Sequence, residues 1–119
     1  MATALTNRAE FTRDQLKLDP VVEGFCDAVR LRFASRLERI VLFGSRARGD
    51  FNDDSDYDIA IFVRNLDNAY TEYKPMAALA MRALAEDNVE INAALHPAED
   101  WRDGTTQLMR AMRREGVEL

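Results

Sequence analysis

The sequence has little of what disulfide-bonded, membrane-spanning or nucleic-acid-coating proteins need. Its 119 residues include a single cysteine, Cys26, so no disulfide framework exists and we expect a reduced, cytoplasmic setting. No stretch approaches the roughly eighteen consecutive apolar residues of a membrane helix, and Glu10 and Asp14 lie where a signal peptide would be apolar. The net charge is −5, whereas a general nucleic-acid surface needs clustered Lys and Arg. We therefore expect no membrane association and no general binding to nucleic acid.

The length limits the number of domains. A chain of 119 residues is long enough to bury one core and too short for two. We expect one domain over residues 19–119 and a polar N-terminal extension over residues 1–18, of which residues 8–18 could form a helix.

A short apolar run leads into a glycine–serine turn. Residues 39–43 read Arg-Ile-Val-Leu-Phe, which favours a buried strand that ends at Gly44. Because Gly44 lacks a Cβ atom, backbone N–H groups can approach an anion there, and Ser45 can offer its hydroxyl to a phosphate oxygen. A Gly-Ser pair on its own more often starts an ordinary turn. The turn therefore indicates a phosphate site only together with a second feature.

Two carboxylates follow at the start of a second expected strand. Residues 57–63 are typical of a strand, and side-chain alternation places Asp56 and Asp58 on one face, about 7 Å apart. Two such carboxylates repel each other unless a cation lies between them, and Mg²⁺ binds carboxylate and phosphate oxygens. An isolated Asp-x-Asp more often belongs to a solvated acidic loop, here with Asp53 and Asp54.

The spacing of these two features carries more information than either feature alone. A strand, a Gly-Ser pair, ten residues and an Asp-x-Asp resemble the signature of the DNA polymerase beta-like nucleotidyltransferase superfamily. More narrowly, residues 44–49 and 55–59 resemble the minimal nucleotidyltransferases, small prokaryotic proteins often paired with HEPN-domain proteins. The resemblance is dense over residues 39–63 and looser elsewhere, and Tyr57 stands where that family usually has Ile or Val.

This resemblance implies a fold, a reaction and a partner. The implied fold is α/β (α+β), of the polymerase beta-like nucleotidyltransferase type, with a small mixed β-sheet flanked by helices. The implied reaction transfers AMP from ATP to a hydroxyl, with two Mg²⁺ ions between Asp56, Asp58 and the triphosphate. Gly44 and Ser45 would hold the terminal phosphates. The implied acceptor is a tyrosine of a HEPN-type toxin, with this chain as the antitoxin.

The family expects a third carboxylate on a later strand. Residues 88–95 alternate between apolar side chains on one face and Glu90, Asn92 and Ala94 on the other. Beside the Asp-x-Asp strand, Glu90 would complete the metal ligands and help to deprotonate the attacking hydroxyl, with Asp87 as the reserve. The plain alternative is an exposed Glu on an amphipathic strand. Arg46 and Arg48 are each as well explained by a phosphate contact as by a surface charge.

The remaining segments are expected to form the scaffold. Asp19 and Pro20 predict a helix start, followed by apolar residues at helical spacing that should cover one sheet face. A second helix is expected through residues 76–84, with Pro75 in its first turn or at a kink. Trp101 is expected to be a packing residue.

The C-terminal part is expected to contain one more helix. It should span residues 104–114 and turn Leu108, Met109 and Met112 inward. His96, the only histidine, precedes a proline and lacks the neighbours of a zinc site, so we expect a loop residue.

Two other interpretations stay open. An aminoglycoside-type adenylyltransferase would share the motif and act on a small molecule, but such enzymes normally have an additional helical domain or dimer wall around the sugar. A binding module that blocks a toxin by contact alone would keep only a remnant of the site. The presence of both aspartates, the turn and a possible third acid disfavours such a remnant.

Overall fold

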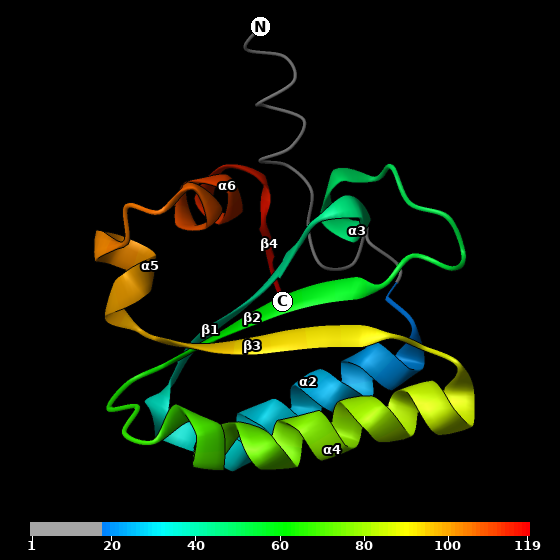
Figure 1. Ribbon diagram of the computed structural model, residues 1–119, viewed down its shortest axis with the longest axis horizontal. Helices are drawn as coiled ribbons and strands as arrows, with labels where there is room; N and C mark the ends of the chain where they lie inside the picture. Colours follow the sequence, from blue (N-terminus) through cyan, green and yellow to red (C-terminus); the bar gives the residue numbers. More distant parts are fainter. Residues whose placement is uncertain (1–17) are drawn as a thin grey trace, which may run out of the picture.

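The computed structural model describes residues 18–119, which form a mixed four-stranded sheet with helices on both faces (Figure 1). In chain order the elements are α2 (Pro20–Phe33), η2 (Ala34–Arg36), β1 (Leu37–Phe43), α3 (Ser45–Arg48), β2 (Tyr57–Val63), α4 (Ala69–Asp87), β3 (Ile91–Pro97), α5 (Glu99–Asp103), α6 (Gln107–Glu115) and β4 (Val117–Glu118). The expected mixed sheet flanked by helices is confirmed. The prediction of one domain over residues 19–119 stays a prediction, and the extension over residues 1–18 lies, except for its last residue, outside the described part.

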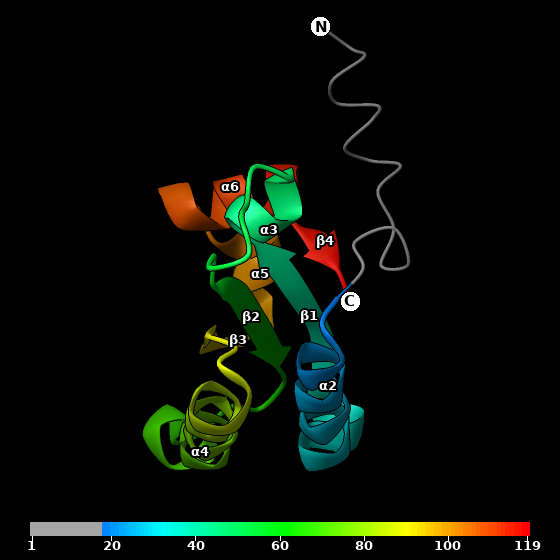
Figure 2. The same cartoon turned by 90° about the vertical axis from the view of Figure 1, so that its right-hand side faces the viewer.

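The sheet has the strand order β3-β2-β1-β4. Strand β1 runs antiparallel to both β2 and β4, whereas β2 and β3 are parallel and are joined by the crossover helix α4. Helices α2 and α4 lie together under one face, and α3, α5 and α6 lie on the other side (Figures 1 and 2). The crossover brings the start of β3 beside the start of β2.

Local sequence signals explain how α2 begins. The Asp19 side chain accepts a hydrogen bond from the Val21 N–H at 2.9 Å, and Pro20 occupies the first turn. This confirms the expected start. The buried residues of α2 face the sheet, among them Cys26, which packs in the core.

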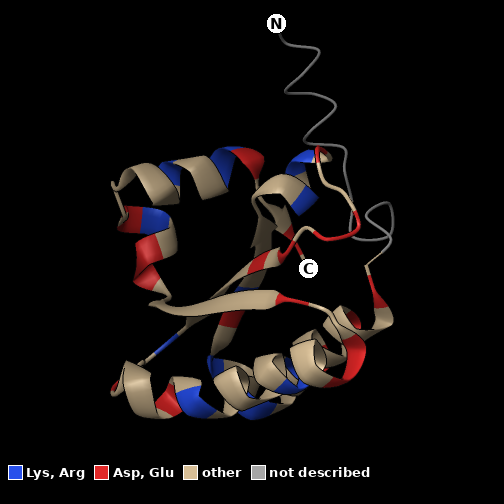
Figure 3. Cartoon of the chain, turned by 45° about the vertical axis from the view of Figure 1, so that its right-hand side comes forward, with Lys and Arg blue, Asp and Glu red and all other residues tan. Residues whose placement is uncertain are grey.

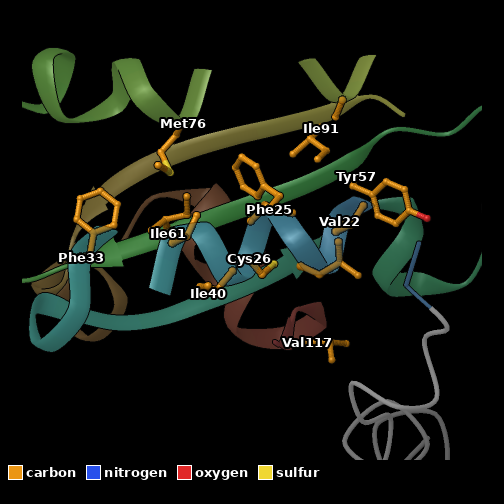
Figure 4. Close-up of a cluster of buried hydrophobic side chains, with 14 of the residues drawn as sticks. Val22, Phe25, Cys26, Phe33, Ile40, Tyr57, Ile61, Met76, Ile91 and Val117 are labelled. Atoms are coloured by element: carbon orange, nitrogen blue, oxygen red, sulfur yellow. The ribbon is translucent and has the colours of Figure 1, made fainter. Parts of the chain in front are cut away.

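Two apolar clusters fill the space on the two sides of the sheet. In the larger, Phe25, Ile61 and Met76 converge from α2, β2 and α4 (Figure 4). The smaller lies on the opposite face and consists of Val41, Ala60, Phe62, Met109 and Met112, with Phe43 and Trp101 packed against it. The packing role expected for Trp101 is thereby confirmed.

The structure corrects several boundaries. Helix α4 begins at Ala69, after the N-cap Asn68, so Pro75 lies in the second turn and not in the first. Helix α6 begins at Gln107, and Leu108 is 46% exposed, so its expected inward position is wrong. A one-turn helix and a two-residue strand are too short for a readable hydrophobic period, which is why α5 and β4 were not predicted.

The last part of β3 also differs from expectation. The strand runs over Ile91–Pro97, so it begins later than the expected residue 88 and ends later than 95. His96 is therefore a strand residue and not a loop residue, and its ring stacks on Phe62 with centroids 5.2 Å apart. Burial lowers the pKa of His96. Among residues 18–119 no helix is long and apolar enough to cross a membrane.

Candidate active site

The glycine–serine turn lies directly against the second aspartate. Gly44 follows the last residue of β1, whose partner across the ladder is Asp58. Its φ of 74° favours glycine, and a Cβ atom there would overlap the Asp58 carboxylate. Position 44 therefore has to be glycine for two independent reasons, backbone conformation and the space taken by Asp58.

A single helical turn, α3, continues from this glycine. The Ala47 and Arg48 N–H groups donate to the Gly44 carbonyl at 3.1 and 3.0 Å, and Gly49 closes the turn in the left-handed conformation. The N–H groups of Ser45 and Arg46 begin the turn and so have no partner inside it. Ala47 is buried and anchors the turn to the core.

The two aspartates are oriented by the alternation of β2. Tyr57, Ile59 and Ile61 are buried in the larger cluster, so Asp58 lies on the other face, as predicted from the sequence. Burial raises the pKa of Asp58, and the negative charge of Asp56 raises it further. A hydrogen bond from Asn92 and the charge of Arg48 act in the opposite direction.

Strand β3 and the residues just before it add polar groups to the same edge. The parallel register places Asn92 opposite Asp58, and the Tyr57 N–H donates to the Glu90 carbonyl at 2.9 Å, so Glu90 lies alongside Asp56. The charge of Glu90 contributes to the raised pKa of Asp58. Asp87, the last residue of α4, and Glu90 line a common pocket of about 250 Å³. Acidic segments thus gather where β2 and β3 begin (Figure 3).

The donor set at this edge fits a magnesium ion in part. Within residues 18–119 no three acidic, histidine or cysteine side chains are arranged as a ready-made metal site. The pair Asp56 and Asp58 nevertheless suits Mg²⁺, which is usually held by one or two carboxylates together with substrate phosphates. Burial and, to a smaller extent, the charges of Asp56 and Glu90 raise the pKa of Asp58, and a cation bound there would offset both effects. The roles of Asp56, Asp58 and Glu90 as metal ligands stay predictions.

Arg46 has a role that the sequence did not indicate. Its Nε and one terminal nitrogen donate to the Ser55 carbonyl at 3.2 and 2.9 Å, and its guanidinium stacks over the rings of Phe51 and Tyr57. These contacts hold the loop that precedes Asp56. They favour a positioning role for Arg46 over the direct phosphate contact that was considered.

Arg48 remains beside the carboxylates. It forms ion pairs with Asp50 at 3.2 Å and with Glu115 at 3.6 Å, and its charge lowers the pKa of Asp58. Arg48 thus links the turn to the end of α6. A phosphate contact by Arg48 stays a prediction.

Asn92 is the residue of the site that sequence reasoning did not single out. Its amide Nδ2 donates to Oδ2 of Asp56. Alternation of residues 88–95 had put Asn92 on the same face as Glu90, but its pairing depends on the register between β2 and β3. That register is not visible in the local sequence.

The family follows from a comparison with known proteins. The model of the family "Polymerase beta, Nucleotidyltransferase" matches residues 31–102. The chain belongs to this family. It is a nucleotidyltransferase, and its candidate active site is the edge where Gly44, Asp56 and Asp58 meet.

Individual relatives agree with the family. The chain is 33% identical over 81 residues to MJ0604 of Methanocaldococcus jannaschii, a candidate protein adenylyltransferase; the match covers 68% of this chain and 75% of that protein. It is 36% identical over 58 residues to the protein adenylyltransferase MntA of Aphanizomenon flos-aquae, with 48% of this chain and 39% of that protein covered.

Solved structures share the fold. A candidate nucleotidyltransferase from Sulfolobus solfataricus has a TM-score of 0.54 and 23% identity, with 98% of this chain and 85% of that one covered. A toxin–antitoxin crystallised with AMP-PNP has a TM-score of 0.53 and 22% identity, with 81% and 70% covered. A mutant of the toxin–antitoxin MntA-HpeT has a TM-score of 0.54 and 21% identity. At these identities the likeness concerns the fold alone.

Proposed function

We propose that this nucleotidyltransferase transfers AMP from ATP, with magnesium, to a hydroxyl of a partner protein. The acceptor that we propose is a tyrosine of a HEPN-type toxin, and the chain would act in the cytoplasm as the antitoxin of the pair. The names of the relatives support protein adenylylation, since both MJ0604 and MntA carry it. The shared fold with a toxin–antitoxin bound to AMP-PNP is consistent with ATP as the donor.

One observation carries this proposal: the contact between Gly44 and the Asp58 carboxylate. Through it, a turn suited to phosphate and a carboxylate suited to a cation lie next to each other. Transfer of a nucleotide needs both at once, because the cation must neutralise the phosphates while the turn fixes their position. Neither feature alone would serve the reaction.

The residues divide the work of the reaction. Asp56, Asp58 and Glu90 would hold two Mg²⁺ ions, which supply positive charge to the phosphates and lower the pKa of a bound hydroxyl. The acceptor oxygen forms a bond to the α-phosphorus of ATP while the bond to the pyrophosphate oxygen breaks. The hydroxyl proton passes to a carboxylate, and the carboxylate that we propose is Glu90, with Asp87 as the reserve. Gly44 and Ser45 hold the phosphates that leave.

The position of the site suits an acceptor as large as a protein. The carboxylates lie at the rim of the sheet, next to the exposed loop that contains Asp53 and Asp54. Asn92 in the neighbouring edge strand is also exposed. A hydroxyl carried on the surface of a partner can therefore approach the rim directly.

A matched pair of double variants tests the proposal. The full chain, labelled ATP, magnesium and the partner encoded next to it are incubated, and label on the partner is measured. Asp56→Asn/Asp58→Asn removes two charges from the site, and Asp53→Asn/Asp54→Asn removes two from the exposed loop just before it. We expect label on the partner with the wild type and the loop variant, and none with the site variant.

The other interpretations give different results in the same experiment. Full neutralisation of the toxin by the site variant, without any label, would favour a module that acts by contact alone. Label that appears on an aminoglycoside and not on the partner would favour a small-molecule adenylyltransferase. Either result would contradict the proposed acceptor.

A further inference from the structure

Asn92 joins the two strands that build the site. It lies in β3 opposite Asp58, and its amide Nδ2 donates a hydrogen bond to Oδ2 of Asp56. The same side chain is also within hydrogen-bonding range of the Asp58 carboxylate. One neutral side chain therefore interacts with both carboxylates of the pair.

The surroundings of Asn92 argue against a role in packing. The side chain is exposed, whereas its neighbours Ile91, Ala93 and Leu95 contact the larger apolar cluster on the other face of the sheet. A polar side chain at an exposed position of an edge strand contributes little to the core. The polar contacts of its side chain are with the aspartates, so its role is to be sought there.

The chemistry of an amide suits a place between two carboxylates. The NH₂ group of Asn has two hydrogens and no charge, and each carboxylate has two oxygens with about four acceptor sites. An amide can therefore bond one oxygen of each carboxylate and leave the other oxygens available. A Lys or Arg would instead compete with a metal ion for the same negative charge, and an acid would add to the repulsion.

We propose that Asn92 is a positioning residue, whose amide holds the Asp56 and Asp58 carboxylates in the orientation in which both bind one divalent cation. This inference rests on the proposed role of the two aspartates as metal ligands. Without the amide, mutual repulsion turns the carboxylates apart, and binding of the cation has to restore their orientation. Partners that orient metal ligands in this way typically change metal affinity about 10- to 100-fold when removed.

Binding of Mn²⁺ to the full chain without nucleotide provides the test. Free Mn²⁺ is measured by electron paramagnetic resonance for the wild type, Asn92→Ala, Asp56→Asn/Asp58→Asn and the control Gln107→Ala, which truncates an exposed amide at the start of α6. We expect Asn92→Ala to bind Mn²⁺ about 10- to 100-fold more weakly than wild type. We expect the control to match the wild type and the double variant to lose binding.

Two further measurements separate positioning from a purely structural role. The melting temperature of Asn92→Ala in EDTA should stay within a few degrees of the wild type, because one exposed hydrogen bond is lost and the core is untouched. In the transfer assay its kcat should approach the wild-type value once magnesium is saturating, so that the defect lies in the concentration of magnesium required. The isosteric Asn92→Asp should melt lower than wild type in EDTA, because it adds a negative charge beside Asp56 and Asp58, and should gain more than the wild type from Mn²⁺.

The pattern across variants decides the outcome. An Mn²⁺ affinity of Asn92→Ala within about twofold of wild type, with binding lost in the aspartate double variant, would overturn the role of Asn92 and leave the metal site intact. Unchanged binding in the aspartate double variant would overturn the metal role of the aspartates and the role of Asn92 with it.

Discussion

The two faces of the sheet differ most clearly within strand β2. Ile59 and Ile61 point toward α2 and α4 and have no exposed surface, whereas Asp58 points to the opposite face, against Gly44 and beside other acids. The first face stabilises the fold by burial of apolar surface. The second face also buries Ala60 and Phe62 farther along β2, but at the start of the strand it keeps negative charges close together, which opposes folding in the absence of a cation. Alternation along β2 thus keeps the face toward α2 and α4 apolar and confines the charges to the start of the other face.

The substitution Asp58→Asn tests this separation most sharply, because it removes a charge from the acidic face without changing the volume of the core. We expect kcat for AMP transfer to fall on the order of 10³-fold, since a metal-binding carboxylate is lost. We expect the melting temperature in EDTA to stay at or above the wild-type value, because burial and the charge of Asp56 both disfavour the carboxylate. Calorimetry and the labelled-ATP assay measure the two effects. A clearly lower melting temperature would show that the Asp58 carboxylate stabilises the metal-free fold, contrary to this expectation.

The same carboxylate should make the stability of the metal-free protein depend on pH. Because the pKa of Asp58 is raised in the folded state, that state binds this proton more tightly than the unfolded chain does. The resulting stabilisation is present below the unfolded pKa and is lost as pH rises through the raised folded pKa. Urea unfolding in EDTA should therefore show that the free energy of unfolding of Asp58→Asn increases relative to that of the wild type as pH rises through this window. A difference that does not vary with pH would contradict the raised pKa.

Removal of apolar volume should have the reverse pattern, with stability lost and chemistry retained. Ile61→Ala opens the larger cluster at a fully buried position and should lower the free energy of unfolding by about 2–5 kcal/mol. Met109→Ala opens the smaller cluster and should lower the free energy of unfolding by about 2 kcal/mol, because fewer buried side chains surround Met109. Urea denaturation at neutral pH measures both. Equal losses would show that the two clusters contribute alike.

A smaller effect is expected from Arg46→Lys, which keeps the charge but cannot form the same fork of hydrogen bonds to the Ser55 carbonyl. We expect kcat/KM to fall roughly 10-fold, which corresponds to ~1.4 kcal/mol. Limited proteolysis should become faster in the loop of residues 50–56, since Arg46 holds it. A higher KM for ATP with unchanged proteolysis would instead indicate that Arg46 contacts phosphate directly.

Features that depend on neighbouring residues were predictable from the sequence. The cap formed by Asp19, the bend at Gly44 and the shared face of Asp56 and Asp58 all follow from a few adjacent positions. Conformational preference and side-chain alternation act over that range. The motif spacing then made the family recognisable, which the match to residues 31–102 confirmed.

Features that depend on pairing between distant segments were not predictable in the same way. The hydrogen bond of Asn92 to Asp56 requires the parallel register of β2 and β3, which a single sequence does not reveal. Arg46 binds backbone carbonyls, and these leave no trace in the identity of the residues that supply them. The sequence also gives no sign of α5 or β4, because neither element is long enough to show a hydrophobic period.

The crossover helix α4 has a consequence for how the protein reaches its final state. Asp58 pairs with Phe43 of β1 across a short connection, whereas the hydrogen bond between Asp56 and Asn92 joins residues 36 positions apart. The entropy lost on closing a loop grows with its length, and distant pairings form slowly. We therefore expect the hairpin of β1 and β2 to order first, and the acids to gain their amide neighbour only when α4 docks.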